Sequence, residues 1–151
     1  MRKVFSTLIF IFALIFSTTA LAAWNFEYKD DRGNEWHIET DTVTVDKNAG
    51  GSLEFHANFS RVFSEQGLKS IKENYQAKGE TFPENAVYEM CRIHFKEEGG
   101  QKYFCVTDLF YIDSDSKPIQ DFGYIDAPIN WDNIEQNSTA DNLFNVAKKY
   151  I

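Results

Sequence analysis

Three histidines are the residues best suited to metal chemistry in this chain of 151 residues. His37, His56 and His94 each fall at a polar position of a segment in which apolar and polar residues alternate. Zinc accepts three imidazole nitrogens together with water, so neighbouring segments would bring the three into a zinc site. No ligand spacing suggests such a site or the carboxylate and carbonyl groups that usually orient its rings. We therefore interpret the three as solvated surface histidines and expect neither a metal nor another cofactor.

The two cysteines, Cys91 and Cys105, lie on either side of a Glu-Glu-Gly-Gly tract. Redox catalysis would require a Cys-x-x-Cys motif at a helix start, which the sequence lacks. The flanking segments "AVYEMCRIHF" and "QKYFCVTDLFYI" alternate, and Glu97–Gly99 suits a three-residue hairpin loop with Gly99 left-handed. That register places Cys91 opposite Cys105. We predict that a disulfide joins them, as is usual in an exported chain.

Other motifs give little support for catalysis. "DSDSKPIQD", from Asp113 to Asp121, has the acidic spacing of a calcium loop. However, Pro118 stands where that loop needs glycine and no Glu closes it, so we interpret the segment as a hairpin turn. The sequence has no nucleophile elbow, no phosphate-binding glycine loop and no His-Glu-x-x-His motif. We predict no catalytic residues and a function other than an enzyme's.

The elements that would position these residues are mostly strands. The clearest alternation is "SLEFHANFSRVF", in which Leu53, Phe55 and Phe59 share one side. The pattern then changes to helical spacing between a capping Ser64 and Gly79. A second helix follows Ser138, with Asp141 three residues later as in a capping box. These patterns predict an α+β domain whose strands bury one face, with one helix inserted mid-chain and one at the C-terminus.

The N-terminus predicts export. Arg2 and Lys3 precede an apolar run of 13 residues, which ends in an Ala-x-Ala pattern. This run is shorter than the roughly 20 residues that span a bilayer. We predict a signal peptide over residues 1–22, cleaved after Ala22 or the neighbouring Ala23, and a single exported domain over 23–151. No later segment is apolar enough to anchor it, so we expect it in the periplasm, on the cell surface or secreted.

Removal of the signal peptide makes the chain more acidic. Arg2 and Lys3 are lost, which leaves 13 basic and 23 acidic residues and a formal charge of −10 rather than −8. Nucleic-acid binding requires a basic surface, so the composition argues against it. A basic protein partner is compatible with this charge.

Two longer segments carry a family resemblance. They are "WHIETDTVTVDKNAGGSLEFHANF" and the ending "FYIDSDSKPIQDFGYIDAPINWDNIEQNSTADNLFNVAKKY". The first segment has a Trp-led strand, an Asp-x-Asp step and another strand, and the ending has a Tyr-rich strand, a Lys-containing turn, a further strand, Trp-x-x-Ile and a Ser-x-x-Asp-x-Leu helix. This order resembles bacterial surface-adhesin E-like proteins. The resemblance implies an antiparallel sheet of about six strands with the C-terminal helix on its concave face, and an exported protein that binds host matrix or serum proteins. The chain departs from that family because its C-terminal helix contains no cysteine.

We therefore expect an exported, non-enzymatic protein-binding module of surface adhesin-like type, with a host matrix or envelope protein as partner. The outer face of the cysteine hairpin is the candidate binding surface, because it gathers basic and aromatic residues on an acidic chain. Its candidate residues are Arg92, His94, Lys96, Lys102 and Phe104. One alternative is a periplasmic binder or inhibitor of a basic hydrolase. Another is a small-ligand site between sheet and C-terminal helix, near His37 or His56.

Overall fold

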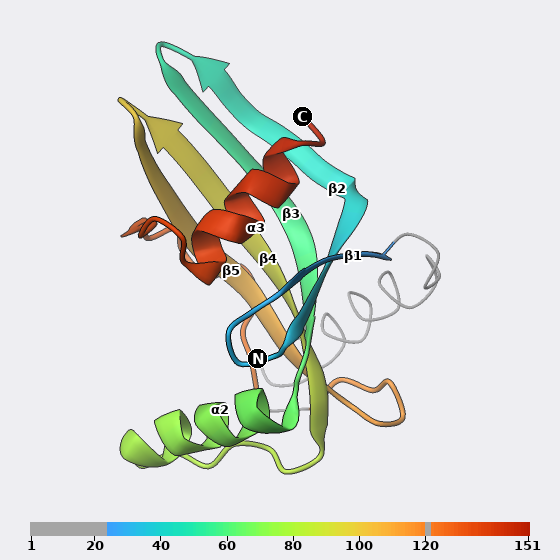
Figure 1. The fold of residues 1–151 in the computed structure, drawn as a ribbon. Helices are drawn as coiled ribbons and strands as arrows, with labels where there is room; N and C mark the ends of the chain where they lie inside the picture. Colours follow the sequence, from blue (N-terminus) through green and yellow to red (C-terminus); the bar gives the residue numbers. More distant parts are fainter. Residues whose placement is uncertain (1–23, 120–121) are drawn as a thin grey trace.

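The computed structural model describes residues 24–119 and 122–151. The predicted signal peptide and its cleavage sites, Ala22 and Ala23, lie outside the described residues. Six strands form one antiparallel sheet in chain order, and two helices complete the predicted α+β fold (Figure 1). The strands are β1 (Trp24–Lys29), β2 (Glu35–Ala49), β3 (Ser52–Val62), β4 (Ala86–Glu98), β5 (Gln101–Asp113) and β6 (Asp132–Asn133). The helices are α2 (Glu65–Ala77) and α3 (Thr139–Lys148).

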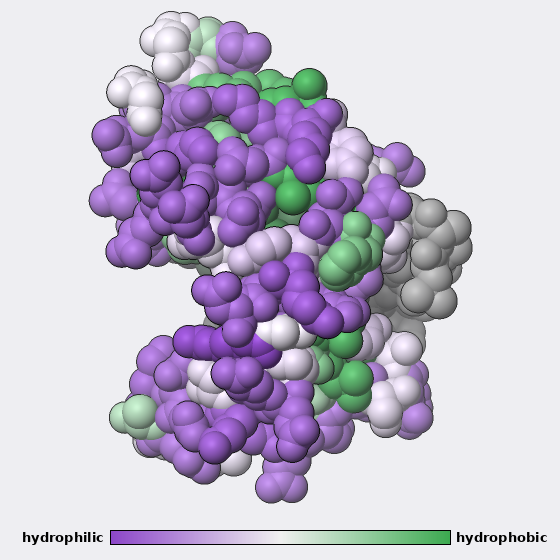
Figure 2. Space-filling view, in the orientation of Figure 1, coloured by the Kyte–Doolittle hydropathy of each residue, from purple (hydrophilic) through white to green (hydrophobic). Residues whose placement is uncertain are grey.

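The sheet has two unlike faces. Phe55, Ala57 and Phe59 of β3 point to the face on which both helices lie, and none has exposed surface. We call this the helix face. The alternating residues of β3, among them His56 and Asn58, point to the opposite side, which we call the outer face. The alternation predicted for this strand is confirmed. The outward surfaces of the helices are largely hydrophilic (Figure 2).

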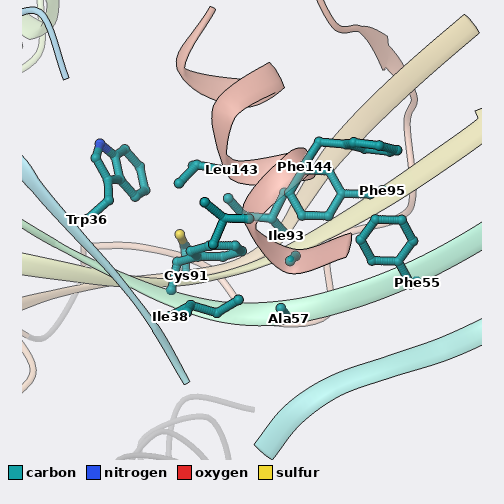
Figure 3. Packing of buried hydrophobic residues seen from close by; sticks show 12 residues of the cluster. Trp36, Ile38, Phe55, Ala57, Cys91, Ile93, Phe95, Leu143 and Phe144 are labelled. Atoms are coloured by element: carbon teal, nitrogen blue, oxygen red, sulfur yellow. The ribbon is translucent and has the colours of Figure 1, made fainter. Parts of the chain in front are cut away.

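Helix α3 closes the main core. Phe144 lies with its ring centroid 5.2 Å from that of Phe55 and 5.6 Å from that of Phe95 (Figure 3). The hydroxyl of Ser138 caps the helix by accepting a hydrogen bond from the Asp141 amide at 3.2 Å, as predicted. None of the three phenylalanines has exposed surface. The concavity between sheet and α3 is thus filled by side chains.

Helix α2 covers the other end of the helix face. Ser64 caps it by accepting a hydrogen bond from the Gly67 amide, as predicted. Below the helix, Ile71, Phe82 and Tyr111 form a second buried cluster. The Tyr75 hydroxyl lies 2.9 Å from that of Tyr111, which joins α2 to β5. Among the described residues, no helix combines the length and apolarity needed to cross a bilayer.

Strand β2 is longer than its neighbour β1. Strand β1 pairs only with Glu35–Glu39, so within the described residues no strand covers the outer edge of β2 beyond that point. The pairing of β2 with β3 is interrupted between Glu39 and Thr44. It shifts again between Val45 and Lys47.

The chain after β5 makes fewer strand contacts than expected. Asp113 accepts hydrogen bonds from the amides of Asp115 and Lys117, so the acidic segment starts with a turn, as predicted. Within the described residues, the second strand that a hairpin turn implies is not formed, because Tyr124 and Pro118 make only isolated bridges with Leu109 and Ile112. The short β6 pairs with β5 instead.

The predicted disulfide is wrong, because Cys91 and Cys105 are both free and buried. Gly99 and Gly100 have φ values of 59° and 80° and form a two-residue turn in place of the expected three-residue loop. Further along the hairpin, Arg92 pairs with Asp108 and Ile93 pairs with Val106, so Thr107 is an extra residue of β5. As a result Cys91 pairs with Leu109, whereas Cys105 pairs with His94. The two thiols therefore lie on opposite faces of the sheet.

Candidate functional site

The outer face carries a group of polar and aromatic side chains that could bind a metal ion or a partner. It is built on β2, β3, β4 and β5, with one residue contributed by the segment before β6. We call this group the outer-face patch: Asp46, His56, Asn58, Arg92, His94, Lys96, Tyr103 and Trp131.

Two histidines and one carboxylate lie at the centre of the outer-face patch. His56 of β3 pairs directly with His94 of β4, and their ring centroids are 4.9 Å apart. The Nδ1 atom of His56 lies 2.9 Å from each carboxylate oxygen of Asp46. The Nδ1 atom of His94 lies 3.7 Å from Oδ2 of the same carboxylate. One ligand atom from each of the three residues lies within 4.8 Å of the others, so the three could hold a metal ion.

The irregular pairing of β2 explains how Asp46 reaches this group. Val45 pairs with Phe55 and Lys47 pairs with Glu54, so Asp46 is an extra residue in β2. An extra residue of this kind bends the strand and changes the direction of its side chain. The three side chains remain open to solvent, with 35% of Asp46, 22% of His56 and 18% of His94 exposed.

The local electrostatics favour the neutral form of His94. The pKa of His94 is lowered, first by its burial and then by the neighbouring His56. A neutral imidazole is the form that can bind a metal ion. Asp46 supplies the counter-charge, because its carboxylate contacts both rings.

A buried polar row supports the centre from one side. The Nε atom of Arg92 donates to Asn58 Oδ1 at 3.1 Å, and Asn58 in turn donates to Glu39 at 3.1 Å. The guanidinium of Arg92 also lies 3.5 Å from the buried carboxylate of Asp108. Such connected networks hold their members in one conformation, so this row fixes the strand positions on which His56 and His94 stand.

An aromatic pair lies on the other side. The ammonium group of Lys96 is 5.2 Å from the ring centroid of Tyr103 and 5.8 Å from that of Trp131. The same group lies 2.9 Å from a carboxylate oxygen of Glu98. Lys96 is therefore held between two aromatic rings at the edge of the outer-face patch.

The five residues of the binding surface predicted from sequence lie on two different faces of the sheet. Arg92, His94 and Lys96 lie together on the outer face, as expected. Lys102 and Phe104 lie on the helix face instead, where Lys102 contacts Asp141 of α3 at 2.8 Å and Phe104 packs against the main core. The two-residue turn shifts β5 by an odd number of positions, which exchanges its two faces.

The structure does not bring all three histidines together. His37 lies against Phe26, with ring centroids 5.6 Å apart, and does not belong to the group formed by His56 and His94. Sequence reasoning missed Asp46, Tyr103 and Trp131. No periodicity could reveal Asp46, because the extra residue breaks the alternation of β2.

Comparisons with protein-family models, with curated proteins and with solved structures find no match. The geometry of the outer-face patch is therefore the main basis for a functional assignment.

Proposed function

We propose that this chain is an exported, non-enzymatic binding domain that recognises a protein partner through the outer-face patch. The observation that carries the proposal is the grouping of Tyr103, Trp131 and Arg92 around Lys96 and His94 on one open face. Tyr, Trp and Arg are the residue types that contribute most to binding energy at protein interfaces.

The packing of the core argues against the small-ligand alternative. Such a ligand would lie between the sheet and α3, yet Phe55, Phe95 and Phe144 fill that space and have no exposed surface. A partner that binds the sheet from outside requires no such cavity. This contrast supports recognition of a macromolecule.

The partner can be tested by site-specific crosslinking in producing cells. A photoreactive residue at Glu54, which pairs with Lys96 on the outer face, is expected to yield a discrete crosslinked protein. The same residue at Gln66, exposed on α2, serves as the position control. Crosslinking should be lost when Arg92 and Lys96 are both changed to Glu. Crosslinking should persist when Lys69 and Lys78, which are exposed on α2 and at its end, are changed to Glu instead.

Equal crosslinking from Glu54 and Gln66, or crosslinking that survives R92E/K96E, would overturn the patch as the binding surface. Far-UV circular dichroism of each variant shows whether it is folded.

The location of the domain decides which class of partner is relevant. An adhesin-like role, supported by the family resemblance, requires that protease added to intact cells digest the chain while a periplasmic marker survives. If the chain survives until the envelope is opened, a periplasmic partner replaces the host matrix protein. The acidic charge of the mature chain then favours a basic protein, whose binding should weaken steeply as salt is added.

A further inference from the structure

We propose that Asp46, His56 and His94 form a binding site for one divalent transition-metal ion, with Zn²⁺ as the reference ion. The three residues belong to the outer-face patch, but the metal site does not require a protein partner. It stands on three side chains from three neighbouring strands, whose ligand atoms converge within 4.8 Å.

The distances fit a tetrahedral ion. Zinc–ligand bonds of about 2.0–2.2 Å at tetrahedral angles place neighbouring ligand atoms about 3.3–3.6 Å apart. The Asp46 carboxylate lies 2.9 Å from His56 Nδ1 and 3.7 Å from His94 Nδ1, which brackets that value. All three ligand atoms lie within 4.8 Å of one another, so modest side-chain rotations would bring them to coordination distance.

The backbone holds the two imidazoles in place. His56 and His94 are directly paired residues of β3 and β4, so the separation of their Cβ atoms is set by the strand pairing and not by a flexible loop. The residues beside them, Asn58 and Arg92, belong to the connected polar row and are hydrogen-bonded to each other. A site on rigid strands loses little conformational freedom when an ion binds.

The ligand set selects the class of metal. Two imidazole nitrogens with one carboxylate suit zinc, copper, nickel or iron, whereas calcium and magnesium prefer all-oxygen sites. Three protein ligands leave a fourth tetrahedral position for water or another group. Because the three side chains are 18–35% exposed, that position can be reached from solvent.

A simple ion pair between Asp46 and His56 is the competing explanation of the same geometry. An ion pair would not need His94, and it would not bind metal. Loss of metal binding on removal of either histidine therefore distinguishes the two explanations.

The test is titration of the mature chain, made without a histidine tag, with ZnCl₂ in a calorimeter. We expect one Zn²⁺ per chain, and an affinity at least about tenfold lower in each of H56A, H94A and D46N, because even changes to groups behind a ligand cost that much. CaCl₂ and MgCl₂ should show no binding. Co²⁺ should give the intense visible absorption of a tetrahedral complex in the wild type, and this absorption should be lost in H56A, H94A and D46N.

His37→Ala is the matched control, because His37 is the remaining histidine and lies outside the group. Its zinc affinity should equal that of the wild type. Absence of zinc binding, or retention of binding in H94A, would overturn the proposal. D46N changes an exposed side chain and keeps its shape, so we expect it to fold. Its zinc affinity therefore tests the metal site even if a histidine variant fails to fold. R92E/K96E is not needed for this test, so failure of the metal site leaves the proposed partner surface untouched.

Discussion

At the scale of single residues, Gly67 shows how tertiary contact overrides helix propensity. It lies in the first turn of α2, where the sequence suggests that glycine weakens the helix. A Cβ atom at this position would lie 1.8 Å from Oδ1 of Asn34. Asn34 is buried, and its Oδ1 accepts a hydrogen bond from the Ser64 amide at 3.0 Å. Gly67 therefore permits the β1–β2 turn to contact the start of α2.

Gly67→Ala is predicted to destabilise the protein, although alanine is the better helix former by roughly 1 kcal/mol. The added methyl group displaces the Asn34 side chain, and overpacking of this kind costs about 1–3 kcal/mol. Urea denaturation measures the change in the free energy of unfolding. Ser70→Ala, on the same helix, is the control and should alter it by less than about 0.5 kcal/mol. A more stable G67A variant would show that Asn34 moves aside without loss.

At the scale of elements, both helices begin where the sequence predicts, because the hydroxyls of Ser64 and Ser138 each accept a hydrogen bond from the backbone amide three residues later. The register of β4 and β5 was not predictable in the same way. The tract "EEGG" is compatible with a two- or a three-residue turn, and the extra residue near Thr107 leaves no trace in the alternation. A helix cap depends on residues close together in the sequence and can be predicted from them, whereas strand register depends on contacts between strands.

The start of α3 is predicted to depend on pH through Asp141. The pKa of this carboxyl is lowered, chiefly by the hydrogen bond from Lys102 at 2.8 Å. A lowered folded-state pKa means that Asp141 stabilises the fold above the ordinary aspartate range. That contribution is lost as the pH falls below about 4 and through the lowered pKa.

Thermal unfolding between pH 2 and pH 7 measures this effect. Asp141→Asn should lower the melting temperature near neutral pH, by an amount equivalent to about 1 kcal/mol, and flatten its decrease in acid. Asp115→Asn, in an exposed turn, is the control and should leave the curve unchanged. An unchanged acid limb in D141N would assign the pH dependence to other carboxyls.

At the scale of the whole molecule, two clusters of buried side chains share one face of one sheet. Phe144 closes the first cluster under α3, and Phe82 lies in the second under α2. Strands β3 and β4 pair without a register shift. From β1 to β5, each neighbouring pair of strands is joined along the chain by a hairpin or by α2. The two clusters therefore depend on the same pairs of strands.

This arrangement predicts cooperative unfolding of the described domain. Phe144→Ala and Phe82→Ala should each lower the free energy of unfolding by about 3–5 kcal/mol, because both remove a buried aromatic ring. In each variant, circular dichroism and tryptophan fluorescence should report one coincident transition. Phe26→Ala is the control, since that side chain is 56% exposed. Two separate transitions would show that the ends of the sheet unfold independently.

The candidate site shows where sequence reasoning ends at this scale. His56 and Arg92 were placed on polar strand faces, and the structure agrees. Their companions Asp46 and Trp131 come from an irregular strand and from a segment before the two-residue β6. Only the folded chain brings these distant segments to one face.

The two glycine pairs at the hairpin tips have a practical consequence. Gly50 and Gly51 join β2 to β3, Gly99 and Gly100 join β4 to β5, and no atom lies within 4 Å of the place where any of the four would carry a side chain. Exposed tips of this kind accept inserted peptides with little effect on the rest of a fold. An epitope or a fluorophore-binding peptide inserted between Gly50 and Gly51 would label the domain while both termini remain unchanged.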